Sequence, residues 1–299
     1  MNNNCLLSIC IPSYKRAQLL SNTLNSIFSQ DVEHKLFEVC VSDDSPDEET
    51  KNMIKSEFSS IDNLVYQKVP DQGFNIVEAL KLGKGEFLKC QNDYALFKEG
   101  SLKKMIDLIS VNIEKRPILY FGLNALKEHF KIECFDNFDL FMKKADLMTT
   151  YLSSIGLWKE DFDFFNSKGI KLVQAFPHTT YLFNCTYKSS IIVDNYSYFE
   201  NQSLKSKGGY NLPEFFVKEY LDLVDDRLYS KSFLSKETRE QLEINIIKFV
   251  ADWYITTKVK SSIYTFSFDN CEQIIKNKCG QQGLELFLKN IEKIEASKN

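Results

Sequence analysis

Apolar and polar residues alternate in blocks along the first hundred positions, in an order typical of a sheet covered by helices. Apolar runs of strand length, each ending in polar residues, occur at 8–16, 37–45, 64–69 and 86–90. Segments with apolar residues at helical spacing lie between them, at 17–30, 48–58 and 75–82. This repeated alternation predicts a mostly parallel sheet with helices on its faces, which is an α/β fold.

The pattern becomes less regular after residue 110. It predicts strands at 117–123 and 172–176, a helix at 138–154, and a polar, aromatic loop at 156–169. From residue 212 onward it predicts helices, at 212–224, 235–260 and 269–296. We therefore expect an α/β domain over 1–210 and a helical C-terminal extension over 211–299.

Polar side chains follow the first two predicted strands at the point where each strand ends. Ser13, Tyr14 and Arg16 follow the first strand, and Asp43 and Asp44 follow the second. In open α/β sheets, ligands bind just beyond the carboxyl ends of the strands. The sequence therefore predicts a ligand site that carries two adjacent carboxylates at this edge of the sheet.

Three segments together resemble the family-2 glycosyltransferases of GT-A fold. They are SICIPSYKR, VCVSDDSPDEET and DQGFNIVEALKLGKGEFLKCQND, and the resemblance covers roughly residues 6–110. It implies a Rossmann-like, mostly parallel sheet and transfer of a hexose-type sugar from a nucleoside diphosphate sugar, with a UDP-sugar favoured. The acceptor would be a saccharide or a lipid-linked saccharide. Inversion at the anomeric carbon and a role in bacterial surface glycans, such as capsule or lipopolysaccharide, are also implied.

The resemblance assigns the nucleotide site to residues at three strand ends, namely Pro12, Ser13, Tyr14, Arg16, Asp43, Asp44, Gly73 and Asn75. Carboxylates accept hydrogen bonds from ribose hydroxyls or a base N–H. Tyr14 could stack on the base, and Arg16 could pair with the diphosphate. The plain alternatives are a capped turn at Asp43 and Asp44, and a solvated arginine at the start of a helix.

The segment Gln91-Asn92-Asp93 stands where the family usually carries an Asp-rich triplet that binds Mg²⁺ or Mn²⁺ through the donor diphosphate. Hard cations prefer oxygen ligands, and the phosphates supply several of them. Asp93 is then the metal anchor, with the Asn92 amide beside the nucleotide, and the ion would stabilise the leaving nucleoside diphosphate. The loss of two carboxylates also allows a degenerate protein that binds a nucleotide or glycan, or scaffolds a partner, without turnover.

Inversion needs a general base, for which the sequence offers two candidates. Family members often carry a Glu-Asp pair at the start of a helix in the second half. The best positional match is Phe-Pro-His at 176–178, which makes His178 a base, a metal ligand or an ordinary loop histidine. The rival is the pair in WKEDFDFF, with Asp161 as base. In that interpretation Trp158 stacks on the acceptor and Ser154 shares in acceptor binding.

Composition narrows the remaining choices. An apolar share of 43% supports a folded core, and a net charge of −4 argues against nucleic acid as a partner. Eight scattered cysteines without a CxxC pair, and the lack of an apolar leader, predict a cytoplasmic protein, which a lipid-linked acceptor would bring to the inner membrane.

The C-terminal helices could cover the sheet or pair two subunits as a homodimer. A sugar nucleotidyltransferase is disfavoured, because no glycine precedes Gly73 in the first strand-end loops.

Overall fold

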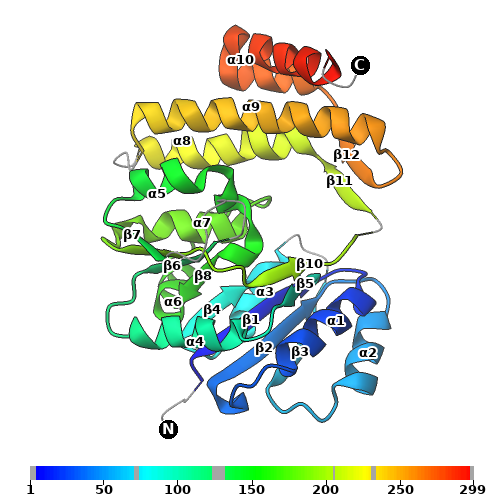
Figure 1. Ribbon diagram of the computed structural model, residues 1–299, viewed down its shortest axis with the longest axis vertical. Helices are drawn as coiled ribbons and strands as arrows, with labels where there is room; N and C mark the ends of the chain where they lie inside the picture. Colours follow the sequence, from blue (N-terminus) through cyan, green and yellow to red (C-terminus); the bar gives the residue numbers. More distant parts are fainter. Residues whose placement is uncertain (1–4, 71–73, 123–131, 205, 230–233, 297–299) are drawn as a thin grey trace. The chain divides into compact units, whose positions relative to one another are not determined.

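The computed structural model describes residues 5–70, 74–122, 132–204, 206–229 and 234–296. The chain divides into two compact units (Figure 1). The first comprises Met1–Asn137 and Thr149–Gln202, and the second comprises Phe138–Met148 and Ser203–Asn299.

A five-stranded sheet in the order β3-β2-β1-β4-β8 forms the centre of the first unit. Its strands are β1 (Leu7–Ser13), β2 (Phe37–Asp43), β3 (Leu64–Lys68), β4 (Phe87–Cys90) and β8 (Gly156–Trp158). The first four run parallel, and β8 runs antiparallel to β4. This arrangement confirms the predicted α/β fold with a parallel-rich sheet.

Helices cover both faces of this sheet. Side chains alternate between the two faces along each strand, so each strand packs against helices on both sides. Leu7, Ile9 and Ile11 of β1 form one core with the apolar faces of α1 (Ala17–Phe28), α2 (Glu49–Glu57) and α4 (Ser101–Val111). The intervening Ser8 points to the other face, where it meets Gly83 at the end of α3 (Asn75–Leu82). Figure 1 shows α1 and α2 lying beside β2 and β3.

Two small sheets extend the unit. They consist of β5 (Ala95–Phe97) with β10 (Phe199–Asn201), and of β6 (Ile118–Phe121), β9 (Ile191–Asp194) and β7 (Ile132–Phe135) in that spatial order. The sequence pattern predicted only β6 among these strands. All five strands are three or four residues long, too short for their periodicity to stand out, and β6 was found because it lies within the longer apolar run 117–123.

Three predicted elements in the middle of the chain are wrong. The helix that starts at residue 138 ends early, as α5 (Phe138–Ala145), because Asp146 adopts a left-handed backbone with φ 49°. Two 3₁₀ turns follow, η3 (Asp146–Thr150) and η4 (Leu152–Ser154). The predicted loop at 156–169 is instead β8 and α6 (Lys159–Ser167), since Phe162 and Phe165 are buried at helical spacing.

The predicted strand at 172–176 is irregular backbone that leads into α7 (Pro177–Asn184). Pro177 occupies the first turn of that helix, where proline fits because its nitrogen needs no hydrogen-bond partner there.

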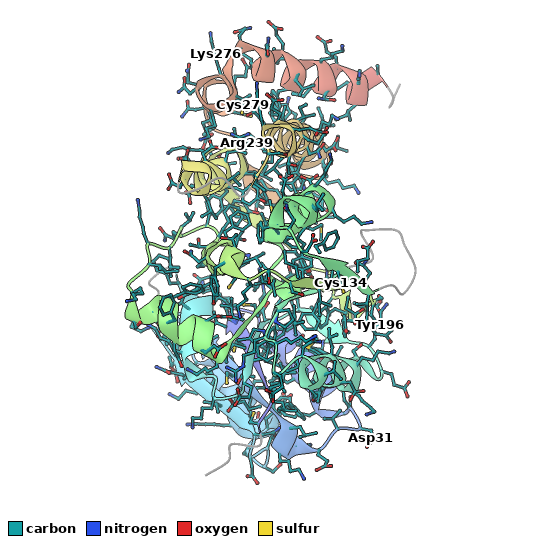
Figure 2. All side chains as sticks on the ribbon, turned by 90° about the vertical axis from the view of Figure 1, so that its left-hand side faces the viewer. Asp31, Cys134, Tyr196, Arg239, Lys276 and Cys279 are labelled. Atoms are coloured by element: carbon teal, nitrogen blue, oxygen red, sulfur yellow. The ribbon has the colours of Figure 1, made fainter. Side chains whose placement is uncertain are left out.

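The second unit contains α5 and a set of longer helices. These are the π-helix η6 (Glu214–Tyr220), α8 (Leu221–Tyr229), α9 (Lys236–Val259) and α10 (Cys271–Ala296), together with a parallel pair of strands, β11 (Lys207–Asn211) and β12 (Tyr264–Ser267). Arg239 on α9, which is labelled in Figure 2, binds Asp225 of α8 through two nitrogen–oxygen contacts of 2.6 and 3.2 Å. Lys278 of α10 reaches the same carboxylate at 2.7 Å. This ion network links three helices of the unit.

Gly280 interrupts α10 with a φ of 72°, so the long C-terminal helix predicted from sequence is kinked. No helix in the described part of the chain combines the length and apolar content needed to cross a bilayer. All eight cysteines lie among the described residues and are free thiols.

Candidate functional site

The carboxyl ends of β1, β2 and β4 meet at one edge of the central sheet. Ser13 is in register with Asp43, so the loops after β1 and β2 leave the sheet side by side. Asn92 and Asp93 lie in the turn that follows β4, after Gln91, and Asn75 begins α3. The structure thus brings the predicted nucleotide and metal residues together, apart from Gly73, which lies outside the described residues.

Asp43 is fully buried, and both of its carboxylate oxygens are occupied by protein groups. Its Oδ1 accepts hydrogen bonds from Ser45 N at 3.0 Å and Ser45 Oγ at 2.5 Å. Its Oδ2 accepts from the Tyr66 hydroxyl at 2.9 Å and from Lys68 Nζ at 3.1 Å. With both oxygens occupied, Asp43 fixes the shape of the loop that follows β2.

Asp44 and Asn75 join three of the strand-end segments. Asn75 Nδ2 donates to Asp44 Oδ1 at 2.7 Å and to the Ser13 carbonyl at 3.1 Å. Asp44 is only half-buried, so it can exchange a protein partner for a ligand more easily than Asp43 can. Tyr14 is 43% exposed, and the Lys15 ammonium lies 5.3 Å from the centre of its ring. Pro12 is half-buried within β1.

Asp93 is a buried carboxylate that pairs with a partly exposed arginine. Its side chain is 2% exposed, and its Oδ1 lies 3.2 Å from Arg16 Nη1. Burial raises the pKa of Asp93 to about 6, although the nearby Arg16 guanidinium opposes that rise. The Ser13 side chain and the Tyr14 backbone also lie close enough to the Asp93 carboxylate to lower its pKa. Oδ2 of Asp93 and the Ser13 hydroxyl are buried and have no partner of good hydrogen-bond geometry among the described residues.

The turn that carries Asn92 and Asp93 is held from two sides. Thr23 of α1 donates to the Asp93 carbonyl at 3.0 Å. On the other side, Asn92 N donates to Ser153 Oγ at 3.0 Å. Ser154 follows in the same 3₁₀ turn, so the structure brings this predicted acceptor residue to the nucleotide edge, with its side chain fully buried.

His178 lies in the first turn of α7 and is 7% exposed. Its Nε2 is 3.0 Å from the Thr150 carbonyl, which can only accept, so Nε2 carries the proton. The neighbouring Thr179 donates to the Thr149 carbonyl at 2.8 Å. Residues 149–154 therefore connect the start of α7 to the turn at Asn92, and His178 belongs to the same side of the unit.

Burial lowers the pKa of His178 from 6.5 to about 4, so this histidine is neutral at pH 7. Because its folded pKa is below its unfolded value, the unfolded chain binds more protons, and stability is lost as the pH falls from 6.5 towards 4. We expect this single group to remove about 2 kcal/mol of unfolding free energy between pH 7.5 and pH 5. Urea unfolding of the wild type and His178→Gln at both pH values measures the difference. Equal losses in the two proteins would contradict the assignment.

Trp158 and Asp161 lie at the opposite edge of the sheet, which corrects their predicted roles. Since β8 runs antiparallel to β4, Trp158 pairs with Phe87, the first residue of β4. Trp158 is 1% exposed, and its indole N–H donates to the Pro117 carbonyl at 2.6 Å. Asp161 is 3% exposed and pairs with Lys188 Nζ at 2.8 Å. Neither side chain is available to an acceptor at the nucleotide edge.

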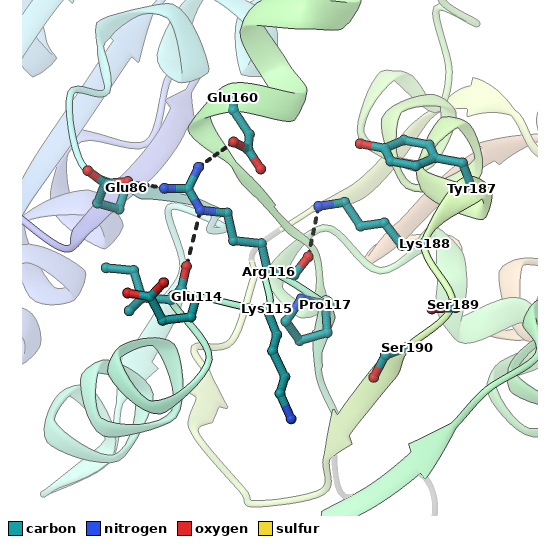
Figure 3. A pocket seen from close by; sticks show the side chains of 11 residues that line it. Glu86, Glu114, Lys115, Arg116, Pro117, Glu160, Tyr187, Lys188, Ser189 and Ser190 are labelled. Atoms are coloured by element: carbon teal, nitrogen blue, oxygen red, sulfur yellow. Dashed lines mark hydrogen bonds and ion pairs between the residues drawn. The ribbon is translucent and has the colours of Figure 1, made fainter.

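A cavity of about 730 Å³ lies at this opposite edge (Figure 3). The Arg116 guanidinium crosses it, binding Glu160 on one side and Glu86 at 3.1 Å on the other. Lys188 donates to the Arg116 carbonyl at 2.8 Å. These contacts link the ends of β4, β6 and α6. Because the charges neutralise one another, we interpret the residues that line the cavity as structural.

Several residues that shape the edge were missed by the sequence analysis. Lys68, Tyr66 and Ser45 hold Asp43, whereas Ser153 and the buried Lys89 support the Asn92 turn. Of these residues, only Lys89 is recognisable in the sequence, as a charged residue inside the apolar run of β4. Among the described residues, no three His, Cys, Asp or Glu side chains converge as a complete metal site.

The described fold and edge define an α/β protein of the GT-A type. Residues 8–112 match the family Glycosyl transferase family 2. Among solved structures, S. aureus TarS 1-349 in complex with UDP-GlcNAc matches with a TM-score of 0.63 and 15% identity, covering 98% of this chain and 91% of that chain. Mannosyltransferase PcManGT from Pyrobaculum calidifontis in complex with GDP-Man and Mn²⁺ matches with a TM-score of 0.52 and 13% identity, covering 95% and 86%.

A longer S. aureus TarS structure is matched over 55% of its length. A search among curated proteins finds no match. At these identities the structural likeness shows the fold alone. The sequence match is to the family and is confined to residues 8–112. The protein has a GT-A-type fold, and its residues 8–112 are similar to glycosyl transferase family 2, as the three sequence segments predicted.

Proposed function

We propose that the protein transfers a sugar from a nucleoside diphosphate sugar to a hydroxyl group of a saccharide or lipid-linked saccharide. The observation that carries this proposal is the convergence of Asp44, Asp93 and Arg16 at the carboxyl edge of the sheet. Carboxylates for ribose hydroxyls and a guanidinium for the diphosphate are the groups that such a donor requires. The match to glycosyl transferase family 2 supports the same reaction class.

The residues of the edge have distinct roles in this proposal. Tyr14, with its exposed ring, stacks on the base, and Asp44 accepts from the nucleoside. Arg16 is 39% exposed on its side chain, so it can turn from Asp93 towards the diphosphate. A UDP-sugar is the favoured donor, because structures of similar fold hold UDP-GlcNAc and UDP, with GDP-mannose as the alternative.

A divalent cation, Mn²⁺ or Mg²⁺, fits the edge only together with the donor. Asp93 offers Oδ2, a buried carboxylate oxygen without a hydrogen-bond partner, and Asn92 offers an amide oxygen. The remaining oxygen ligands would come from the diphosphate. When bound, such an ion stabilises the negative charge of the leaving nucleoside diphosphate. We therefore expect weak metal binding in the absence of nucleotide.

His178 is the proposed general base for an inverting displacement. Since its Nε2–H is held by Thr150, Nδ1 is the nitrogen that can accept a proton. A pKa near 4 makes it a weak base in the ligand-free protein. Ser154 is proposed to help shape the acceptor side. The resemblance further supports a place in bacterial surface glycan synthesis, such as capsule or lipopolysaccharide, at the cytoplasmic side of the inner membrane.

The competing function is a protein that binds a nucleotide or glycan, or scaffolds a partner, without turnover. Gln91 and Asn92 favour it, because neither supplies a carboxylate to a metal ion. This alternative predicts nucleotide binding that is indifferent to divalent metal, and no loss of sugar from any donor.

A thermal-shift panel tests the proposal. UDP, GDP, CDP, dTDP and CMP are each added with and without Mn²⁺ to the wild type, Asp44→Asn and the control Asp163→Asn, which changes an exposed carboxylate of α6. A nucleotide at about a hundred times its dissociation constant adds about 2.7 kcal/mol of stability, which raises the melting temperature by several degrees. We expect this shift with one nucleoside diphosphate plus metal in the wild type and control, and its loss in Asp44→Asn. No shift with any nucleotide would contradict the donor site.

A further inference from the structure

Lys89 is a fully buried lysine within the hydrophobic core of the first unit. It is in register with Ile9 of β1, so its side chain enters the apolar side of the sheet that α1 and α4 cover. Its ammonium lies 5.3 Å from the centre of the Phe121 ring and 5.2 Å from that of Phe199. A lysine is almost never fully buried unless its charge is paired.

No carboxylate contacts Lys89 among the described residues; its two hydrogen-bond partners are backbone carbonyls. Nζ donates to the Cys90 carbonyl at 2.6 Å and to the Ser153 carbonyl. The titratable groups that face it are the thiols of Cys90 and Cys10. Burial raises the pKa of Cys90 to about 12 and that of Cys10 well above its ordinary value, so neither supplies a negative charge at neutral pH.

The two carbonyls tie Lys89 to the turn that follows β4. Ser153 accepts from Lys89 through its carbonyl, and from Asn92 N through its hydroxyl at 3.0 Å. Lys89 therefore holds the short segment that in turn orients the backbone at Asn92. The ammonium also places a positive charge, not neutralised by any described carboxylate, three residues before this turn. A charge in a low-dielectric core acts on a ligand more strongly than one in water.

We propose that Lys89 is a positioning residue for the donor diphosphate, acting through Ser153 on the Asn92 turn and through its buried positive charge. This inference rests on the proposed donor site. An apolar residue would fill the same core space at lower cost, since an unpaired buried ammonium is unfavourable. The proposed role at the donor site explains why a charged residue occupies this core position.

Burial also lowers the pKa of Lys89 to about 7. Because this folded value is below the unfolded one, the charge is present in the folded protein below pH 7 and lost as the pH rises. Donor affinity should accordingly weaken between pH 6.5 and pH 8.5. The free energy of unfolding of the wild type should also rise between pH 6.5 and pH 8.5, relative to Lys89→Met. The folded protein loses the Lys89 proton in this range, whereas the unfolded chain keeps it.

The test is a titration of UDP-GlcNAc and GDP-mannose with Mn²⁺ at pH 6.5 and pH 8.5. The proteins are the wild type, Lys89→Met, which keeps the length and apolar stem, and Ser153→Ala. Lys188→Met is the matched control, since Lys188 is a largely buried lysine at the opposite edge of the sheet. A sugar nucleotide is used because its diphosphate does not change charge in this range.

The wild type should bind one donor about tenfold more weakly at pH 8.5 than at pH 6.5. Lys89→Met should bind about tenfold more weakly at pH 6.5 and show no pH dependence, and the effects of Lys89→Met and Ser153→Ala should not add in the double variant. Lys188→Met should keep the wild-type affinity and pH dependence. Equal affinity and pH dependence in the wild type and Lys89→Met would overturn this inference alone. Failure of the wild type to bind either donor would overturn the proposed function and this inference with it.

If Lys89→Met does not fold, the wild type still decides the matter. A pH-independent affinity between pH 6.5 and pH 8.5 would overturn the role of the buried charge, whereas the tenfold change supports it.

Discussion

Replacing Asp93 with asparagine should reduce metal-dependent sugar transfer by about a thousandfold or more, while the folded protein becomes slightly more stable at pH 7.5. Activity falls because the amide of the Asp93→Asn variant would supply no carboxylate to the ion that stabilises the leaving group. Stability rises because burial holds the pKa of Asp93 near 6, above its ordinary 3.8, so its ionised form is disfavoured in the fold. We expect a gain of about 1–2 kcal/mol in the free energy of unfolding.

The two effects have opposite signs, which separates a functional carboxylate from a structural one. Asp163→Asn serves as the control, since Asp163 is an exposed carboxylate paired with Lys159 at the other edge of the sheet. It should change neither quantity. Urea unfolding at pH 7.5 gives the stability, and release of nucleoside diphosphate gives the activity. An Asp93→Asn protein that loses stability and keeps its metal dependence would show that Asp93 is a core residue.

Replacing Asp43 with alanine should lower the free energy of unfolding by roughly 3 kcal/mol and abolish nucleotide binding. The carboxylate accepts hydrogen bonds from Ser45, Tyr66 and Lys68. Its loss leaves the buried Ser45 and the partly buried Tyr66 without this acceptor, whereas Lys68 keeps the Asp47 carbonyl. The β2 loop would then lose the contacts that fix its shape. Denaturant unfolding measures the first effect, and nucleotide titration measures the second.

Asp44→Ala is the matched variant, one residue further along the same loop. Asp44 is half-buried and joined to Asn75, so we expect a stability loss below about 1 kcal/mol with an equally severe loss of nucleotide binding. Similar stability in the two variants would show that the hydrogen bonds to Asp43 do not hold the loop.

The front of the sheet could be predicted from sequence because its signals are local and agree with one another. Each apolar run from β1 to β4 ends in polar residues, and parallel strands bring such ends to one edge. This pattern placed Asp43 and Asp44 at the edge, and the resemblance to family-2 glycosyltransferases added Asp93. The resemblance added roles for these residues, which spacing alone does not provide.

The helices and strands after residue 110 could not be predicted well from sequence, because tertiary contacts determine where they form. Trp158 and Asp161 were assigned to the acceptor side, but the direction of β8 places them at the opposite edge, and strand direction is not visible in a three-residue strand. The helix at 138 ends at Asp146 through a single left-handed residue. Lys89 was passed over because a charge in a four-residue apolar run does not reveal whether its partner is a carboxylate or a carbonyl.

The central claim is that this edge of the sheet holds a nucleoside diphosphate sugar and releases the nucleoside diphosphate. The most direct measurement follows nucleoside diphosphate release from UDP-GlcNAc and GDP-mannose by the wild type with Mn²⁺, with Asp93→Asn in parallel. We expect slow release from one donor, because water replaces the missing acceptor, and no release above background with Asp93→Asn. Tight binding of a donor without release, unaffected by Mn²⁺, would contradict the account and indicate a binding protein instead.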